Sequence, residues 1–171
     1  MGDDRSEGID ELIAEREIRK VLVRYSRGID RCDEELIRSV YHADATDDHG
    51  QFKGSGSEFA SWVVPILRDS FDATMHDLGN VTIELEADSA RVETYVIAYH
   101  VAPGKDARRL ITVGGRYLDR FECRGGEWKI ARRVVVIDWN KTEVMQENFP
   151  VDRYRQGSRW PEDPSYEEGL R

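Results

Sequence analysis

Apolar residues near the start of the chain recur at intervals of three, four and seven positions, which is the spacing of one face of an α-helix. This stripe predicts an amphipathic helix over residues 8–27. Gly28 is its expected end, because glycine readily adopts the left-handed conformation that closes many helices. The residues of the stripe are Ile9, Leu12, Ile13, Ile18, Val21, Leu22, Tyr25 and Ile29.

Two more helices are expected before residue 70. The acidic residues 33–35 suit the positive N-terminal end of a short second helix, and Tyr41 would lie on its apolar side. A short strand and a Gly-Ser loop are expected over residues 43–56. Ser57 is the expected N-cap of a third helix, and Pro65 is expected to kink or break that helix.

From residue 74 onward, apolar and polar residues alternate, which is the period of a β-strand. Residues 81–85 and 92–98 predict a hairpin in which the numbers of paired residues sum to 175, and longer strands are expected over residues 109–122 and 127–138. Helices followed by antiparallel strands indicate an α+β domain. We expect a cone-shaped α+β barrel, with three N-terminal helices packed on a strongly curved, mainly antiparallel sheet around an apolar space for a small molecule.

The composition changes near residue 140. Residues 1–140 are expected to form the cone domain, and residues 141–171 a polar C-terminal tail with three prolines. The tail is expected to act as a lid or as an oligomer contact. Tyr154, Trp160 and Tyr166 are its expected anchors.

Acidic residues outnumber basic residues by 34 to 25, which gives a formal net charge of −9. This balance disfavours nucleic acid and anionic membranes as partners, because both attract a basic surface. No apolar run approaches the roughly 20 residues that span a bilayer. The polar start has no signal-peptide core, so we expect a cytoplasmic protein whose partner is a small hydrophobic molecule.

The cysteines and histidines predict neither a metal site nor another cofactor. Cys32 and Cys123 are far apart in the sequence and are expected to be reduced thiols. The four histidines form no H-x-x-x-H or H-x-H pair. His42 and His49 flank three aspartates, but alternation along a strand would spread these groups over both faces.

Four residues are candidates for acid–base chemistry inside the cone: Tyr25, Asp30, His76 and His100. Asp30 is either a cap of the second helix or a site carboxylate, and Tyr25 is either core or a polar tip near the same helix end. The hairpin register points His100 inward and His76 outward. A bulge at Gly79 would reverse His76 and place both histidines on the inner face, one diagonal step apart.

Arg132 and Arg133 lie in a run whose neighbours are apolar on both faces, so at least one guanidinium is directed at a buried surface. A buried charge is costly unless it is paired. Its candidate partners are Asp119, Asp138, Asp30 and a substrate oxygen, and a structural pair is favoured.

Taken together, the chain resembles the SnoaL-like branch of the nuclear transport factor 2 superfamily over residues 9–139. Four stretches carry the resemblance. They are IRKVLVRY at 18–25 followed by GID at 28–30, VYHADA at 40–45, TMHDLGN at 74–80, and GRY at 115–117 with GEWKI at 126–130. These motifs identify a fold better than an activity, because this fold hosts enzymes, binding proteins and structural subunits.

Three lyases of this superfamily share parts of the pattern: scytalone dehydratase, lindane dehydrochlorinase and bile-acid 7α-dehydratase. The resemblance implies that His76 is a base, as the equivalent strand histidine is in all three, and that Asp30 holds it, as in the last two. Tyr25 matches a tyrosine of the bile-acid enzyme. His100 matches the second histidine of scytalone dehydratase, where the bile-acid enzyme carries an aspartate nearby.

The resemblance also implies that an arginine of the last strand binds substrate, and this is Arg132 or Arg133, with Tyr117 as a further candidate. The leading hypothesis is a cofactor-independent lyase that performs a dehydratase-type elimination, or a related isomerisation, on a hydrophobic cyclic oxygenated molecule. In this hypothesis Tyr25 or His100 protonates or polarises the leaving hydroxyl. The alternatives are a non-catalytic binding protein with the same cone, and a structural subunit like the small subunits of ring-hydroxylating dioxygenases.

The last strand predicts self-association into a homodimer or homotrimer. Val134 and Val136 lie on one of its faces and Val135 and Ile137 on the other, while the cone interior can cover only one face. Since large exposed apolar patches are rare on monomers, a second copy is expected to cover the other face. Light scattering at micromolar concentration should give two or three times the mass of the chain, and a monomeric mass would rule this prediction out.

Overall fold

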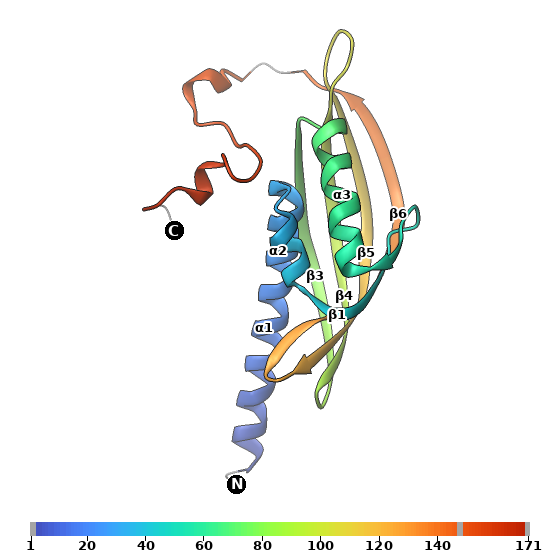
Figure 1. Ribbon diagram of the computed structural model, residues 1–171, viewed down its shortest axis with the longest axis vertical. Coiled ribbons are helices and arrows are strands. Elements are labelled where there is room, and N and C mark those ends of the chain that lie inside the picture. The colour runs from blue at the N-terminus through green and yellow to red at the C-terminus, as the bar shows by residue number, and fades with distance from the viewer. Residues whose placement is uncertain (1–2, 147–148, 170–171) are drawn as a thin grey trace.

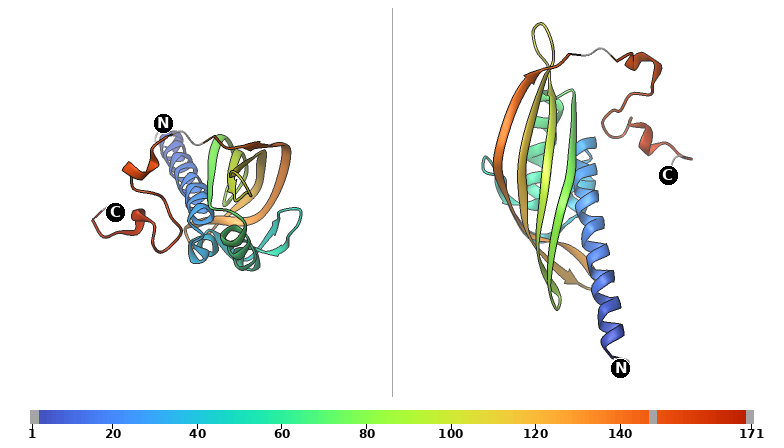
Figure 2. Two further views of the ribbon diagram at one scale, coloured as in Figure 1. Left: turned by 90° about the horizontal axis from the view of Figure 1, so that it is seen from above. Right: turned by 180° about the vertical axis from the view of Figure 1, so that it is seen from behind.

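Three helices lie on the inner side of one curved sheet in the computed structural model, which describes residues 3–146 and 149–169 (Figure 1 and Figure 2). β1 pairs with β6 in parallel, and the other neighbouring strands of this part of the chain are antiparallel. The predicted α+β fold is therefore confirmed. The helices are α1 (Asp3–Arg31), α2 (Glu34–Ser39) and α3 (Gly56–Ser70). The strands are β1 (Tyr41–Asp48), β2 (Lys53–Ser55), β3 (Ala73–Glu86), β4 (Ser89–Ala102), β5 (Arg109–Arg124) and β6 (Glu127–Val144), in the sheet order β2-β1-β6-β5-β4-β3.

The first helix extends further at both ends than its apolar pattern predicts. It spans Asp3–Arg31 and passes through Gly28, which was the expected end. Gly28 is instead a position of close packing, since a Cβ there would lie 2.9 Å from Cγ1 of Ile37 in α2. The left-handed residue that follows the helix is Cys32, with a φ of 52°. This later end places Asp30 within the last turn of α1.

The first turns of α1 project beyond the sheet (Figure 1). Ile9, Leu12 and Ile13 therefore remain 50%, 67% and 51% exposed, although the sequence pattern predicted them on a buried face. The stripe is buried from Ile18 onward, where α1 lies over the sheet. Within the described residues, none of the helices combines the length and apolar character needed to cross a bilayer.

The segment around α3 also differs from the prediction. Tyr41, expected on a helix, opens β1 and is buried. Ser55 rather than Ser57 caps α3, because its hydroxyl accepts from the N–H of Glu58 while the Glu58 carboxylate accepts from the N–H of Ser55. The helix runs without a break through Pro65, which lies on its exposed side.

The hairpin of β3 and β4 has the predicted register and the predicted bulge. Val81 pairs with Thr94, so the paired numbers sum to 175 as expected. The pairing shifts by one residue across the segment that contains Gly79. Because such a shift exchanges the two faces of a strand, His76 lies on the inner face, one diagonal step from His100.

Arg133 is the most deeply buried charge of the sheet. Its side chain is 0% exposed and binds the Asp119 carboxylate through two bonds, Nε to Oδ1 at 2.8 Å and Nη2 to Oδ2 at 2.6 Å. The guanidinium carbon lies 4.0 Å from the ring centroid of Tyr25 and 4.1 Å from that of Tyr117. The interpretation of Arg133 as part of a structural ion pair is confirmed.

The C-terminal tail folds back onto the ends of α1 and α2. The sheet itself continues past the expected boundary at residue 140, since β6 ends at Val144. The N–H of Trp160 then donates to the carbonyl of Arg31 at 2.6 Å, and the hydroxyl of Tyr166 donates to the Asp33 carboxylate at 3.0 Å. The third expected anchor, Tyr154, is largely exposed.

Removing one member of the buried Arg133–Asp119 pair should destabilise the fold more than removing both. Asp119→Leu leaves a buried guanidinium without its counter-charge, which costs about 3–5 kcal/mol. The double variant Asp119→Leu, Arg133→Met removes both charges and should recover much of that loss. Urea denaturation followed by circular dichroism measures both values.

The matched control for this prediction is Asp138→Leu, because Asp138 also pairs with an arginine, Arg116, but lies outside the core. Its effect on the free energy of unfolding should be far smaller. An Asp119→Leu variant as stable as this control would show that the buried pair contributes nothing to the fold.

Candidate active site

A cavity of about 240 Å³ lies between the helices and the inner face of the sheet. Its walls are mostly apolar and come from α1, α3, the strands β3 to β6 and the residue that follows β1, His49. An apolar pocket with a few convergent polar groups is the usual form of a small-molecule site. The polar side chains that line it are Tyr25, His49, His76, His100 and Tyr117.

Asp30 holds His76 by two hydrogen bonds. Nδ1 of His76 lies 2.8 Å from Oδ1 of Asp30, and the backbone N–H of His76 donates to Oδ2 at 2.9 Å. The predicted contact between the two residues is confirmed. Because a carboxylate only accepts, Nδ1 carries the proton of this bond, and Nε2 is the ring nitrogen left for a ligand.

Arg159 of the tail fixes the position of Asp30. Its guanidinium donates to the backbone carbonyl of Asp30 at 2.6 Å, to the hydroxyl of Thr74 at 2.7 Å and to the carbonyl of Phe71 at 3.3 Å. It therefore joins the end of α1 to the start of β3, the two elements that carry the Asp30–His76 pair. Arg159 was not among the residues predicted from the sequence, because no local pattern relates a tail residue to a helix so far away in the chain.

His100 contributes a neutral imidazole ring to the wall of the cavity. Its ring centroid lies 5.6 Å from that of His76 and 4.8 Å from that of Phe71. Burial, and then the neighbouring His76, lower the pKa of His100 to about 4. Its Nδ1 is buried without a hydrogen-bond partner among the described residues. At neutral pH this ring therefore has no extra proton to give.

Tyr25 is fully buried against the cavity. Its hydroxyl lies 3.2 Å from Nε2 of His49, and its ring meets that of Tyr117 edge to face at 5.6 Å. Burial raises the pKa of Tyr25 well above its usual value, although Arg133 acts in the opposite direction. The phenol is thus neutral, and its hydroxyl can exchange a hydrogen bond with the His49 ring.

A second histidine–aspartate pair faces the same cavity. Nδ1 of His49 contacts Oδ1 of Asp47, and the Tyr41 hydroxyl donates to Oδ2 of Asp47 at 2.6 Å. The His49 ring stacks on Phe59 with centroids 4.1 Å apart. From the sequence, His49 was considered only as a metal ligand. The Asp-x-His spacing was the available signal, because residues two apart in an extended chain share a face.

The predicted substrate-binding residues separate in the structure. Tyr117 lines the cavity, whereas Arg133 lies behind Tyr25 and Tyr117 in its ion pair. Arg132 is exposed and lines a hollow elsewhere with Thr82 and other residues, so its prediction as a cavity residue is wrong. Successive residues of a strand point to opposite faces, and Arg133 takes the inner one.

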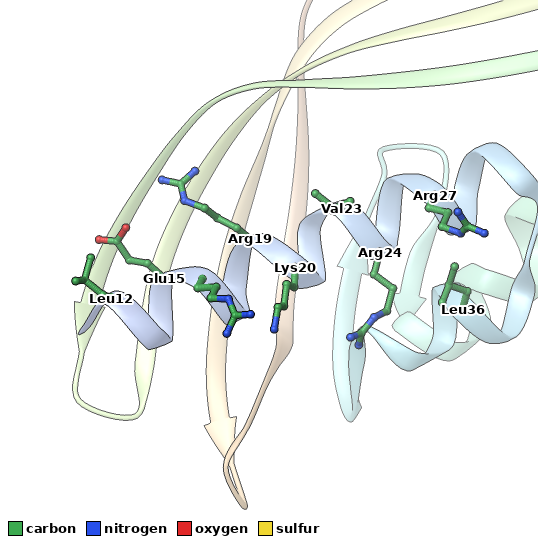
Figure 3. Close-up of a pocket in the computed structure, with 9 residues that line it drawn as sticks. Leu12, Glu15, Arg19, Lys20, Val23, Arg24, Arg27 and Leu36 are labelled. Atoms are coloured by element: carbon green, nitrogen blue, oxygen red, sulfur yellow. The ribbon is translucent and has the colours of Figure 1, made fainter. Parts of the chain in front are cut away.

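A larger hollow of about 800 Å³ lies on the exposed side of α1 (Figure 3). Basic side chains dominate its lining, and Leu36 of α2 stands at one end. Its lining includes one carboxylate, Glu15, but no histidine and therefore no histidine–carboxylate pair. The basic residues are Arg16, Arg19, Lys20, Arg24 and Arg27. Among the residues that the structure describes, no group of three or more histidine, cysteine or acidic side chains could hold a metal ion.

Comparisons with known proteins agree with this fold. A family model described as a SnoaL-like domain matches residues 10–134. No curated protein sequence matches the chain. A type 2 hexachlorocyclohexane dehydrochlorinase (LinA) superposes with a TM-score of 0.74 at 20% identity, covering 84% of this chain and 97% of that one. A putative scytalone dehydratase from Novosphingobium aromaticivorans gives 0.68 at 20% identity, with 85% and 97% covered. The LinA type 3 dehydrochlorinase from Novosphingobium barchaimii gives 0.73 at 19% identity, with 84% and 99% covered.

The low pKa of His100 predicts a pH-dependent stability. Between about pH 6.5 and 4 the unfolded chain binds a proton at residue 100 that the folded chain excludes, so stability falls as the pH falls. His100→Gln should remove this contribution, which amounts to about 3 kcal/mol between pH 7 and pH 4. Urea denaturation of both proteins at several pH values measures the difference in slope.

His42→Gln is the control, because the His42 ring bonds the backbone carbonyl of Glu122 away from the cavity. This variant should keep the pH dependence of the wild type. If the curves of stability against pH for His100→Gln and the wild type run parallel between pH 7 and pH 4, His100 takes up a proton equally in the folded and unfolded chain. The low pKa of His100 in the folded protein would then be wrong.

Proposed function

The chain belongs to the SnoaL-like domain family, and from this premise we propose that it is a cofactor-independent lyase. The reaction is a dehydratase-type elimination, or a related isomerisation, on a hydrophobic cyclic oxygenated small molecule. A non-catalytic binding protein with the same cavity remains the alternative hypothesis.

The observation that carries this proposal is the Asp30–His76 pair at an apolar cavity. A binding pocket would need His76 only as a polar contact. Here the bond from Nδ1 to Asp30 fixes the ring and its tautomer, and the bond from the backbone N–H holds the strand against the same carboxylate. A histidine held in this way by a carboxylate is the usual form of a general base. The side chains of His76 and Asp30 are 9% and 12% exposed, so bulk water has little access to them.

The proposed reaction begins when Nε2 of His76 removes a proton from a carbon next to a carbonyl group. The electron pair of the C–H bond forms the new double bond, and the hydroxyl leaves from the next carbon. His76 becomes an imidazolium, and Asp30 stabilises its charge through the 2.8 Å bond to Nδ1. The low pKa of His100 argues against it as the donor to the leaving hydroxyl, so Tyr25 is the remaining candidate of the two.

The size and lining of the cavity support a small hydrophobic substrate. Its volume of about 240 Å³ is below the range of roughly 300–1,000 Å³ for drug-sized ligands, so a single ring or a small fused bicycle fits best. Its walls include Phe59, Val63, Leu67, Val96 and Val135. Apolar walls also exclude water, which strengthens the interaction of Asp30 with a charged His76.

The reactions of the structural neighbours support an elimination for this chain, but they do not indicate its substrate. A dehydrochlorinase removes a hydrogen and a chloride, and a dehydratase removes a hydrogen and a hydroxyl. Both reactions remove a proton from a carbon atom, next to the carbon that loses the leaving group. The proposal for this chain takes from them only that the same type of cavity suits such an elimination.

Substitution of the pair should separate chemistry from binding. His76→Ala should lower the rate of elimination by about 10²- to 10⁴-fold, because it removes the positioned base. Asp30→Asn should lower kcat more than it changes KM, because Asp30 contributes most when His76 is charged in the transition state. The measurement is turnover of cyclic β-hydroxy ketones together with exchange of their α-hydrogen into deuterated water.

His42→Ala, which changes a histidine outside the cavity, should leave both rates unchanged. Thermal melts of all variants check that each protein is folded. Tight binding of cyclic ketones to the wild type without any exchange of the α-hydrogen would support the binding protein and contradict the lyase.

A further inference from the structure

Elimination of a hydroxyl group needs a proton at the leaving oxygen, and Tyr25 alone is a poor source. A phenolate at this buried position would be costly, because burial penalises the charged form. The phenol therefore needs a second group that returns a proton to it in the same step. The structure provides a ring nitrogen for this purpose, since Nε2 of His49 lies 3.2 Å from the Tyr25 hydroxyl.

We propose that His49, held by Asp47, supplies the proton that Tyr25 passes to the leaving group. This inference rests on the proposed elimination and deepens it. It gives the cavity two histidine–aspartate pairs with opposite tasks, in which His76 takes a proton from carbon and His49 delivers one toward oxygen. His49 acts through Tyr25 and is therefore a positioning and proton-supplying residue.

The contacts of His49 form a continuous path. Tyr41 donates to Asp47 at 2.6 Å, Asp47 contacts Nδ1 of His49, and Nε2 of His49 reaches Tyr25. Phe59 of α3 stacks on the ring and keeps its plane fixed. Since Nδ1 faces a carboxylate, Nε2 is the nitrogen that exchanges a proton with the phenol.

A row of buried charges lies beside this path. Asp47, Arg133 and Asp119 occupy one row across β1, β6 and β5, as the strand register shows. The side chains of all three are 0% exposed. Arg133 pairs with Asp119 through two hydrogen bonds, so His49 is the side chain placed to carry a positive charge opposite the Asp47 carboxylate. A buried carboxylate without such a partner is costly.

The proposed step balances in atoms and charge. The C–O bond breaks, and the leaving oxygen takes both electrons of that bond and the proton of Tyr25 to become water. Tyr25 takes the Nε2 proton of His49 at the same time, so no phenolate accumulates. The cavity begins with a neutral His76 and a charged His49, and it ends with a charged His76 and a neutral His49. Exchange of protons with solvent then restores both.

The test compares two probes, β-hydroxycyclohexanone and β-acetoxycyclohexanone, on the full chain. Acetate leaves without protonation, whereas hydroxide needs a proton from the site. His49→Gln should slow the loss of water by about 10²-fold or more. It should leave the loss of acetate and the exchange of the α-hydrogen into deuterated water little changed, because His76 and Asp30 remain intact.

Two further variants sharpen this comparison. Asp47→Asn should act in the same direction as His49→Gln, because it removes the charge that holds the imidazolium. Asp44→Asn is its matched control on the same strand, since Asp44 is exposed and pairs with Arg124. This control should change neither rate. Thermal melts establish that each variant is folded before its rates are compared.

The outcomes separate the two proposals. If the wild type exchanges the α-hydrogen and His49→Gln loses water as fast as the wild type, the relay is overturned and the lyase proposal stands. If both leaving groups slow equally in a folded His49→Gln, His49 only shapes the cavity and the relay is again overturned. If the wild type shows neither exchange nor elimination, the proposed function is contradicted.

A measurement without any substrate tests the relay independently. Nitrogen NMR of the histidine rings distinguishes a protonated ring nitrogen from a bare one. At neutral pH the wild type should show both nitrogens of His49 protonated, and Asp47→Asn should reduce that population. A His49 ring with a bare Nε2 in the wild type would overturn the proposal, whatever the probes show.

Discussion

The carboxylate of Asp30 joins the last turn of α1 to the inner face of β3 by holding both the backbone and the ring of His76. The rest of the site depends on this contact. It requires α1 to run past Gly28, so that Asp30 reaches the sheet, and it requires the bulge in β3 that turns His76 inward. Arg159 then joins the same two elements from the tail. The tail is therefore part of the framework of the site, which a division of the chain near residue 140 would not suggest.

The core on the other side of the cavity is organised around charge. The Arg133–Asp119 pair lies under the rings of Tyr25 and Tyr117, and Asp47 of the neighbouring strand extends the same row to His49. The residues that stabilise the sheet are thus the residues that set the polarity of one cavity wall. The interior of the cone is therefore not wholly apolar, because paired charges lie directly behind two tyrosine rings.

The sequence allows the register of the hairpin to be predicted because alternation and a tight turn are both local, and Gly79 marks the bulge in the same way. The contact of Asp30 with His76 follows once the bulge is assumed. The features that the sequence pattern did not predict depend on packing between segments that are far apart in the chain. The α1 stripe is buried only from Ile18 onward, because the first turns of the helix project beyond the sheet (Figure 1), and Arg159 reaches Asp30 across 129 positions of the chain. His49 was considered only as a metal ligand because several aspartates precede it in sequence. Its contacts are with one of these, Asp47, and with Tyr25 of α1, which the local pattern does not relate to it.

The role of the Asp30–His76 pair is tested most directly by a crystal structure with a bound cyclic enolate mimic, such as a phenol or a cyclic β-diketone. The ring is expected to fill the cavity of about 240 Å³. An oxygen or the acidic carbon should lie within about 3.5 Å of Nε2 of His76, with a second oxygen directed at Tyr25. A ligand found only in the basic hollow outside α1, or one that leaves His76 without a contact, would show that this pair is not the centre of the site.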